Sequence, residues 1–312
     1  MRSIFVRLAV LAALALPLAA PAGASAQGGP VRLAAPADCL TNPACAPGLR
    51  RVYGLRVDAA FVPLRVADAG VTALDDGIAE VAVAFTSSPD LSRPDVLALR
   101  DDRGMLKPDR VVPVVRSALL RRVGRAAARD IRRRLDDASE LISTRVLRQL
   151  NQGVADGRLP EAVGGEFVDA NGLGDDRRRG RGPRIVVGYQ AFAENETLAH
   201  LYAEALRAGG HRVTVRPVGG LRREALARMR AGRISIYPDY ARSLLSHLRG
   251  GRAVGDATRA SLRAALARRG LQPMRFAPGE NRNVFVVKRD TAASLGVSKL
   301  SDLARHWPAA AP

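Results

Sequence analysis

Residues 184–218 read RIVVGYQAFAENETLAHLYAEALRAGGHRVTVRPV and change in pattern from strand to helix to strand. Residues 184–189 form an apolar run typical of a buried strand. Residues 193–210 have apolar side chains at helical spacing and end in two glycines, and residues 211–218 are strand-like again. Residues 221–238 continue with a helix, a glycine stop and another buried strand. Strands that alternate with helices predict an α/β fold whose parallel or mixed sheet is covered on both faces.

A linker-like segment divides the chain into two halves that share a plan. Residues 73–85 (ALDDGIAEVAVAF) and 228–238 (RMRAGRISIYP) both run from a helical pattern through a glycine into a buried strand. Residues 164–183 are dense in glycine and carry charge in blocks, which is typical of a linker. We therefore expect the same structural unit once in each half of the chain.

The N-terminal residues have the pattern of an export signal. A short basic segment with Arg2 and Arg7 precedes the apolar run LAVLAALALPLAA, and small residues at 24–26 mark a cleavage site. We expect residues 1–26 to be a cleaved signal peptide, residues 27–37 to be a disordered lead-in, and the mature chain to lie in the periplasm. No later segment has the roughly 18 continuous apolar residues that a membrane-spanning helix requires.

Cys39 and Cys45 are the only cysteines of the sequence. Because an exported protein meets an oxidising compartment, we expect them to form a disulfide that closes a small loop. A metal site is the alternative, but the four histidines are scattered without ligand spacing. We expect no metal and no other cofactor.

The formal net charge of +19 raises the question of an anionic partner such as nucleic acid. The excess positive charge is almost all arginine, spread along predicted helical faces, with one run at 177–182. Aromatic residues make up 4% of the chain, too few for a platform on which bases stack. The composition therefore indicates a solvated basic surface and no nucleic-acid partner.

Segments from both halves together resemble one protein family. The chain is similar to the quaternary-amine solute-binding proteins of ABC importers, the type that binds glycine betaine, choline or carnitine. The segments that carry the resemblance are CAPGLRRVYGL, AEVAVAFTSSPDL, LALRDDRGMLKPDRVVPVVR, IVVGYQAFAENETLAHLYAEALRAGGHRV, LARMRAGRISIYPDYARSLL and LGVSKLSDLA. The resemblance covers most of residues 38–307. It implies a two-lobed periplasmic-binding-protein fold of type II, with the ligand in the cleft between the lobes.

The order of these segments differs from the order in the family. Here the family's later half, 38–160, precedes its earlier half, 184–307, so the chain resembles a circular permutant with its junction at 161–183. The termini of a domain are often close together, which makes such a permutation physically tolerable. The family fold then implies the following parts: lobe A at 113–286, containing the junction; lobe B at 38–110 plus 289–307; and a two-segment hinge crossing near 111–113 and 287–290.

The resemblance also implies where the ligand binds. A quaternary ammonium group is recognised by the negative faces of aromatic rings, and a ligand carboxylate requires cationic, N–H or hydroxyl donors. Ligands of α/β proteins usually bind at the carboxyl ends of strands. The positions that match the family's binding segments are Tyr189, Gln190, Phe192, Tyr237, Tyr240, Arg242, Asn283 and Phe285, with Thr86, Ser87 and Ser88 from the other lobe. Ordinary core or turn packing is the alternative for each of them.

Three of these positions depart from the family pattern. Gln190 stands where the family prefers lysine, Ser88 replaces an aspartate, and Arg242 replaces a glycine. Arg242 beside a cationic group would be unfavourable, whereas beside a ligand carboxylate it would take the place of the missing lysine. The departures therefore favour a ligand that carries an acid as well as an amine, or a receptor whose ligand differs from the family's usual one.

These patterns predict a monomeric periplasmic receptor that binds glycine betaine, choline or a related quaternary amine or zwitterion. It would deliver this ligand to an ABC transporter permease in the inner membrane for osmoprotectant uptake. A ligand-sensing module on the same fold, reporting to a membrane partner, is the alternative. A periplasmic enzyme is a third hypothesis, but the sequence offers no nucleophile–base pair and no P-loop. We therefore expect no enzymatic activity.

Overall fold

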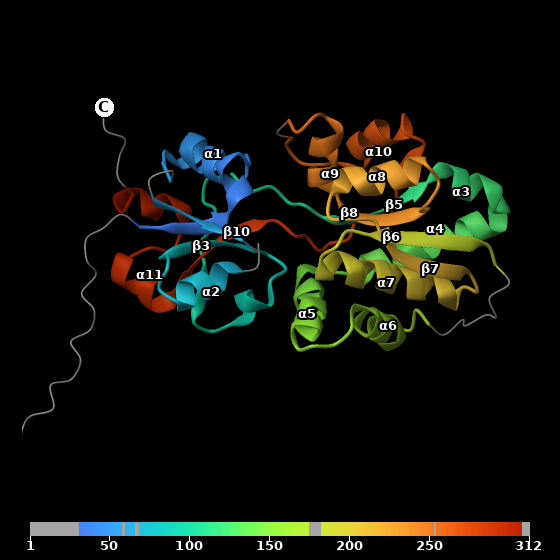
Figure 1. The fold of residues 1–312 in the computed structure, drawn as a ribbon, viewed down its shortest axis with the longest axis horizontal. Helices are drawn as coiled ribbons and strands as arrows, with labels where there is room; N and C mark the ends of the chain where they lie inside the picture. Colours follow the sequence, from blue (N-terminus) through green and yellow to red (C-terminus); the bar gives the residue numbers. More distant parts are fainter. Residues whose placement is uncertain (1–30, 58–59, 66–68, 175–181, 253, 308–312) are drawn as a thin grey trace, which may run out of the picture.

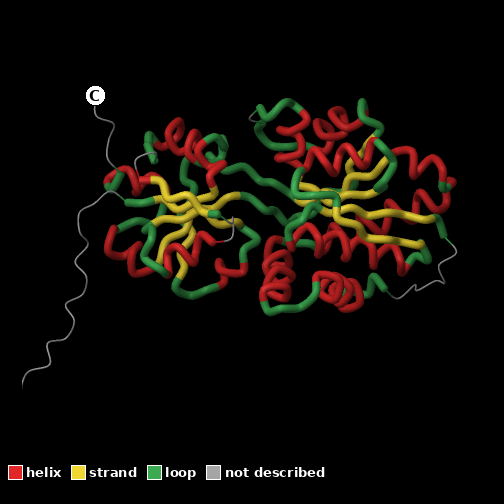
Figure 2. The backbone as a smooth tube through the Cα atoms, viewed as in Figure 1, coloured by secondary structure: helices red, strands yellow, loops and turns green. Residues whose placement is uncertain are grey.

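The computed structural model describes residues 31–57, 60–65, 69–174, 182–252 and 254–307. Its elements form two lobes, each built around one five-stranded sheet with helices on both faces (Figures 1 and 2). The predicted α/β class and two-lobed architecture are confirmed. The expected signal peptide lies outside the described residues.

The elements are as follows. The strands are β1 (Leu33–Pro36), β2 (Phe61–Leu64), β3 (Val81–Phe85), β4 (Val96–Ala98), β5 (Val111–Arg116), β6 (Arg184–Tyr189), β7 (Arg212–Pro217), β8 (Ile236–Tyr240), β9 (Leu271–Pro273) and β10 (Asn283–Lys288). The α-helices are α1 (Ala46–Gly48), α2 (Gly70–Asp75), α3 (Ser117–Arg122), α4 (Gly124–Leu141), α5 (Thr144–Ala155), α6 (Pro160–Ala170), α7 (Ala193–Ala208), α8 (Arg222–Arg230), α9 (Ala241–Leu248), α10 (Arg259–Ala267) and α11 (Arg289–Leu295). Short 3-10 or π turns are η1 (Ala37–Leu40), η2 (Leu49–Tyr53), η5 (Pro89–Ser92) and η6 (Leu300–Arg305).

The two sheets share one topology. Lobe B has the strand order β2-β1-β3-β10-β4, and lobe A has the order β7-β6-β8-β5-β9. In each sheet the first three strands are parallel, and the fourth is antiparallel to both of its neighbours. That fourth strand comes from a distant part of the chain. The chain therefore has to pass between the lobes twice.

The two crossing segments run side by side. Arg110 and Glu280 form an isolated antiparallel bridge, and the Asn281 N–H donates to the Asp109 carbonyl oxygen at 3.0 Å. The hinge is thus a short two-stranded ribbon. In Figure 1 its two segments are the loops that connect the lobes. It lies before β5 and before β10. The predicted crossings near 111–113 and 287–290 therefore lie too late in the chain. Residues 111–113 belong to β5, and residues 287–290 lie at the end of β10 and the start of α11.

Two segments differ from the predicted domain plan. Residues 33–36, expected in a disordered lead-in, form the buried strand β1, which pairs with β2 and β3. The run LAAP does not alternate between apolar and polar residues. β1 lies between two other strands and is covered by helices on both faces, so neither of its faces meets solvent. The strand β10 lies in the sheet of lobe B, so this lobe begins at residue 283 on its second passage rather than at 289.

Part of the predicted linker 161–183 is a packed helix. The helix α6 lies against α7, and Gly164 makes the close approach possible. A Cβ atom at Gly164 would lie 2.7 Å from the backbone nitrogen of Leu201, too close for any side chain. The first part of the predicted linker therefore belongs to the packed core of lobe A.

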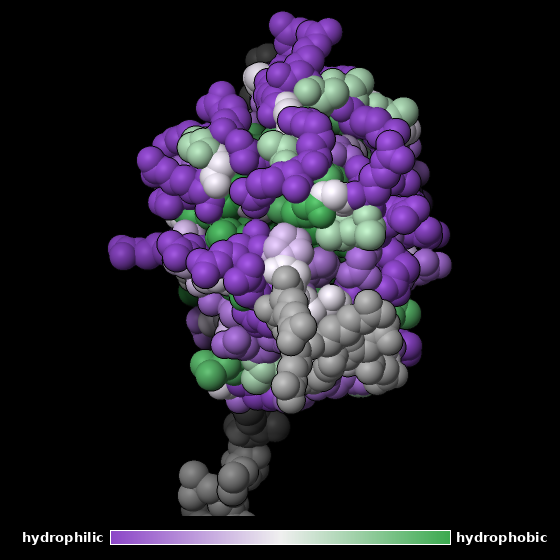
Figure 3. Space-filling view, turned by 90° about the vertical axis from the view of Figure 1, so that its right-hand side faces the viewer, coloured by the Kyte–Doolittle hydropathy of each residue, from purple (hydrophilic) through white to green (hydrophobic). Residues whose placement is uncertain are grey.

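Apolar side chains fill both faces of each sheet. In lobe A, one core packs under α4 to α7 and the other under α8 to α10. In lobe B, Cys39 and Cys45 form a disulfide at the edge of one core. The end of lobe A that Figure 3 faces is mostly hydrophilic, with smaller apolar areas between the charged side chains. None of the described helices combines the length and the apolar character needed to cross a membrane.

Candidate functional site

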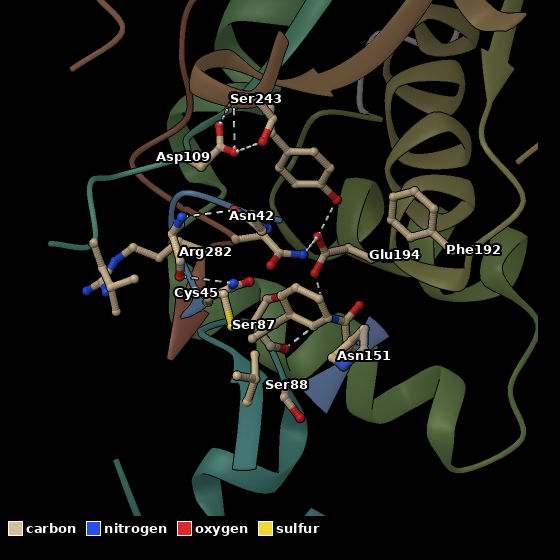
Figure 4. A pocket seen from close by; sticks show the side chains of 18 of the residues that line it. Asn42, Cys45, Ser87, Ser88, Asp109, Asn151, Phe192, Glu194, Ser243 and Arg282 are labelled. Atoms are coloured by element: carbon tan, nitrogen blue, oxygen red, sulfur yellow. Dashed lines mark hydrogen bonds between the residues drawn. The ribbon is translucent and has the colours of Figure 1, made fainter. Parts of the chain in front are cut away.

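A cavity of about 820 Å³ lies between the two lobes, a size that suits a small-molecule ligand. Lobe A lines it with α5, the first turn of α7 and the start of α9, and lobe B with the η1 loop and the end of β3. Both hinge segments contribute residues to its wall. Figure 4 shows these side chains converging from both lobes.

One wall of the cavity is aromatic. Phe192 is the N-cap residue of α7, and its extended backbone directs the side chain away from the helix, so that it remains 40% exposed. The ring of Tyr240, at the end of β8, stacks on it with centroids 6.4 Å apart and an interplanar angle of 24°. Phe85 lines the cavity from the end of β3 in lobe B. These ring faces are of the kind that attracts a cation.

A buried carboxylate lies beside this wall. Glu194, in the first turn of α7, accepts hydrogen bonds from the Tyr240 hydroxyl, from Asn281 Nδ2 at 2.8 Å and from Asn151 Nδ2 at 2.6 Å. Burial raises the pKa of Tyr240 well above its ordinary value, and the charge of Glu194 adds to this effect. The Tyr240 hydroxyl therefore stays protonated and acts as a donor.

Glu194 has no cationic partner among the described residues. It is only 7% exposed, and all three of its hydrogen-bond donors are neutral. A buried charge without an opposite charge is costly. The cavity therefore contains a negative centre that a cationic ligand would neutralise.

The helix α5 of lobe A contacts lobe B across the cavity. Arg148 Nε donates to the Thr86 carbonyl oxygen at 2.8 Å, and Asn151 Nδ2 donates to the Ser87 carbonyl oxygen at 2.9 Å. Asn151 thus touches Glu194 and the opposite lobe with the same amide group. The two walls of the cavity are joined directly at this point.

The hinge residue Asp109 caps α9. Its carboxylate accepts from the Arg242 N–H at 2.7 Å, from the Ser243 N–H at 3.2 Å and from the Ser243 hydroxyl. Figure 4 shows Asp109 and Ser243 facing one another at one end of the cavity. Burial raises the pKa of Asp109 to about 6, although the hydrogen bonds from Ser243 and Arg242 oppose this effect. Arg242 also lines the cavity, and its Nε donates to the Val254 carbonyl oxygen at 3.1 Å.

Six of the predicted ligand-binding residues line the cavity. They are Phe192, Tyr240, Arg242, Asn283, Ser87 and Ser88. They come from both lobes, as a ligand enclosed between two lobes requires.

Tyr237 lies away from the cavity for a geometric reason. Tyr237 and Tyr240 are three residues apart on β8, and successive side chains of a strand point to opposite faces. Tyr240 therefore joins the core on the α7 side, and Tyr237 joins the core under α8 and α9. The Tyr237 hydroxyl donates to Gln190 Oε1, and Gln190 Nε2 donates to the Gly220 carbonyl oxygen at 2.9 Å.

The remaining predicted residues also lie outside the cavity lining. Thr86 is buried at the hinge, where its hydroxyl donates to the Glu280 carbonyl oxygen at 3.0 Å. Phe285 lies on the inserted strand β10, which is covered on both faces, and is 1% exposed. The Tyr189 ring packs near His200. Gln190 is turned toward Tyr237, as described above.

Several polar residues of the cavity wall were not predicted as ligand-binding. They include Lys107, Asn151, Glu194 and Asn281. The sequence could have indicated Glu194, because this residue lies in the first turn of the helix that follows a predicted strand end. Asn151 and Asn281 reach the site only through the packing of α5 and the path of the hinge. Within the described ranges, no group of three or more His, Cys, Asp or Glu side chains is placed to hold a metal ion.

Comparison with known families decides the class of this chain. The family model for the substrate-binding domain of ABC-type glycine betaine transport systems matches residues 17–170 and 183–311. The chain belongs to this family. With its two lobes and shared sheet topology, it is a substrate-binding protein of an ABC transporter with the type II binding-protein fold.

Solved structures similar to this glycine betaine-type domain are distant in sequence. PhnD1 from Prochlorococcus marinus, in complex with methylphosphonate, is 13% identical, with 88% of this chain and 82% of that chain covered and a TM-score of 0.42. A phosphate-binding protein of a phosphate ABC transporter from Streptococcus pneumoniae is 13% identical, with 89% and 96% covered and a TM-score of 0.43. The aliphatic sulphonate binding protein SsuA from Escherichia coli is 11% identical, with 85% and 63% covered and a TM-score of 0.39. A sequence comparison with curated proteins finds no match.

Proposed function

We propose that this chain is a periplasmic receptor that binds a small amine cation or zwitterion, of the glycine betaine or choline class, for uptake by an ABC importer. One observation carries the proposal. The cavity between the lobes places the exposed face of Phe192 beside Glu194, a buried carboxylate that has no cationic partner among the described residues. An aromatic face together with an uncompensated negative charge is a site for an organic cation.

The other charged groups of the wall suit the acid end of a zwitterion. Lys107 and Arg242 both line the cavity. Lys107 forms no ion pair with any described residue, and the Arg242 guanidinium uses one N–H on a backbone carbonyl. Both keep donors that a ligand carboxylate accepts. We therefore propose that Lys107 and Arg242 supply the positive charge that the family's lysine provides at the position of Gln190.

We also infer that the chain is a circular permutant of the family's usual order. The Val31 N–H donates to the His306 carbonyl oxygen at 3.4 Å, so the two ends of the described chain are neighbours in lobe B. The family match breaks between 170 and 183, where the permutation junction is expected. A rearranged chain, in which residues 183–307 precede residues 31–174, should fold and bind the same ligands. A rearranged chain that does not fold would contradict the permutation.

The proposed function predicts stabilisation by amine ligands. At about 100 times the dissociation constant, a ligand adds about 2.7 kcal/mol to the free energy of unfolding. We expect glycine betaine, choline, carnitine or a less methylated relative to raise the melting temperature at millimolar concentration. If no amine of this class raised it, the proposed function would be wrong.

Phe192 provides a matched test of the site. Phe192→Ala removes the exposed ring and should weaken binding on the order of tenfold, because it removes both a cation–π contact and apolar contact area. Leu221→Ala is the control, since Leu221 is comparably exposed at 45% but lies outside the cavity lining. Calorimetric titration of both variants would measure the difference. Equal affinities for the two variants would place the ligand elsewhere.

A further inference from the structure

The helix α5 turns one of its faces toward the hinge and lobe B. Figure 1 shows it on the side of lobe A that faces lobe B. The opposite side of the helix packs through Leu147 and Leu150 into the core of lobe A. Residues spaced by four, three and four positions lie on one face of a helix. On α5 these residues are Thr144, Arg148, Asn151 and Ala155.

This face runs from the hinge to the cavity. At its start, Thr144 Oγ1 accepts from the Glu280 N–H of the hinge at 3.1 Å. The Gly279 N–H donates to the carbonyl oxygen of Ile142, just before the helix, at 2.7 Å. At its other end, Ala155 lines the cavity. The helix is therefore attached to lobe A and to the hinge, and it reaches the ligand site from there.

The middle of this face binds main-chain oxygens of lobe B. The strand β3 and its pairing with β10 both end at Phe85. The next two residues, Thr86 and Ser87, accept through their carbonyl oxygens from Arg148 Nε at 2.8 Å and from Asn151 Nδ2 at 2.9 Å. If the lobes moved apart, these oxygens would lose both donors and would need water instead. The two hydrogen bonds therefore exist only while the lobes are together.

The two donors stand in different relations to the ligand site. Asn151 lines the cavity, and its Nδ2 also donates to the Glu194 carboxylate. Arg148 is half-buried and is not among the residues that line the cavity. Any effect of Arg148 on ligand binding must therefore pass through the position of the lobes.

Two-lobed binding proteins close around their ligand by rotation about the hinge. We propose that α5 is the element that holds this protein closed, with Arg148 as a positioning residue that fixes lobe B over the ligand and slows its release. A hydrogen bond from a charged donor is stronger than one between neutral groups, so Arg148 contributes the larger share. This inference rests on the proposed function and adds a residue that controls affinity without contacting the ligand.

The distance between the lobes tests the inference directly. Spin labels at Asp76→Cys in lobe B and Ala162→Cys in lobe A would report it, since both residues are exposed and outside the cavity lining. Pulsed electron paramagnetic resonance is measured without ligand and with glycine betaine at the concentration that half-saturates the parent protein. Adding Arg148→Met should shift the distribution to longer distances. Adding Arg145→Met, an exposed arginine on the same helix, should not.

Ligand release gives a second measurement. Arg148→Met should weaken glycine betaine about tenfold in calorimetric titration, mainly through faster dissociation in stopped-flow measurements. Arg145→Met should bind like the parent protein. The ligand-free melting temperature separates the two roles, because a merely structural role would lower it together with the affinity, whereas a positioning role leaves it unchanged.

The outcomes distinguish this inference from the proposed function. Equal distances in Arg148→Met and the parent protein, both without ligand and with it, would overturn the inference. Equal affinity in the two proteins would also overturn it while the proposed function stood. If the parent protein bound neither glycine betaine nor choline nor carnitine, the proposed function would be wrong, and the ligand-free distances alone would decide the role of Arg148.

Discussion

Replacing Arg222 with methionine is expected to lower the free energy of unfolding by about 3–5 kcal/mol. Asp239 is fully buried on β8, and Arg222 Nε donates to its two carboxylate oxygens at 2.9 and 3.0 Å. Removing one partner of a buried ion pair leaves the other charge unpaired in the protein interior. Among the described residues, Asp239 would then keep one hydrogen-bond donor, the Tyr240 N–H at 2.8 Å.

The neighbouring arginine provides the control for this prediction. Arg223 is exposed on the same helix, and Arg223→Met should change the free energy of unfolding by less than about 1 kcal/mol. The double variant Arg222→Met, Asp239→Asn should recover much of the loss, because it removes the charge that was left unpaired. Urea denaturation followed by circular dichroism measures all three. Equal stability of the two single variants would show that the pair contributes little.

Replacing Asp109 with asparagine is expected to change how stability depends on pH. Burial raises the pKa of Asp109 from 3.8 in the unfolded chain to about 6 in the folded protein. Between these two values the folded protein binds more protons than the unfolded chain, so the contribution of Asp109 to stability falls as the pH rises. Well above pH 6 the loss is complete, and the difference between the two pKa values corresponds to about 3 kcal/mol.

The asparagine side chain keeps the shape of Asp109 and does not titrate. The stability of Asp109→Asn relative to the parent protein should therefore rise by about 2 kcal/mol between pH 4 and pH 7, because part of the full change lies below pH 4. The exposed Asp76→Asn is the control and should run parallel to the parent protein. Urea denaturation at several pH values measures the difference. A constant difference between Asp109→Asn and the parent protein across this range would contradict the raised pKa.

The fold was predictable because its signals are local. Each strand–helix–strand unit shows its own periodicity, and the helical pattern expected over 117–155 corresponds to α3, α4 and α5. The inserted strands β5 and β10 carry no local sign of the sheet they join. Which sheet each of these strands joins depends on where the chain crosses between the lobes. For this reason the predicted hinge lies a few residues later in the chain than the observed one.

Residues of the site were predictable only where they lie at or just after the end of a predicted strand. Phe192 and Tyr240 directly follow or end predicted strands. Side chains alternate along β8, so Tyr237, three residues from Tyr240, points to the opposite face of the sheet. Asn151 lies within an amphipathic helix and Asn281 within the hinge, and only tertiary packing brings them to Glu194. Lys107 is an isolated cation in a loop and has no local feature that points to a ligand.

The most direct test of the account is a crystal structure of the protein grown with glycine betaine. The account predicts ligand density in the cavity between the lobes, with the ammonium group against Phe192 and beside Glu194. It places the ligand carboxylate toward Lys107 and Arg242. Density for the ligand at any other place on the protein, or an empty cavity at saturating ligand, would contradict it.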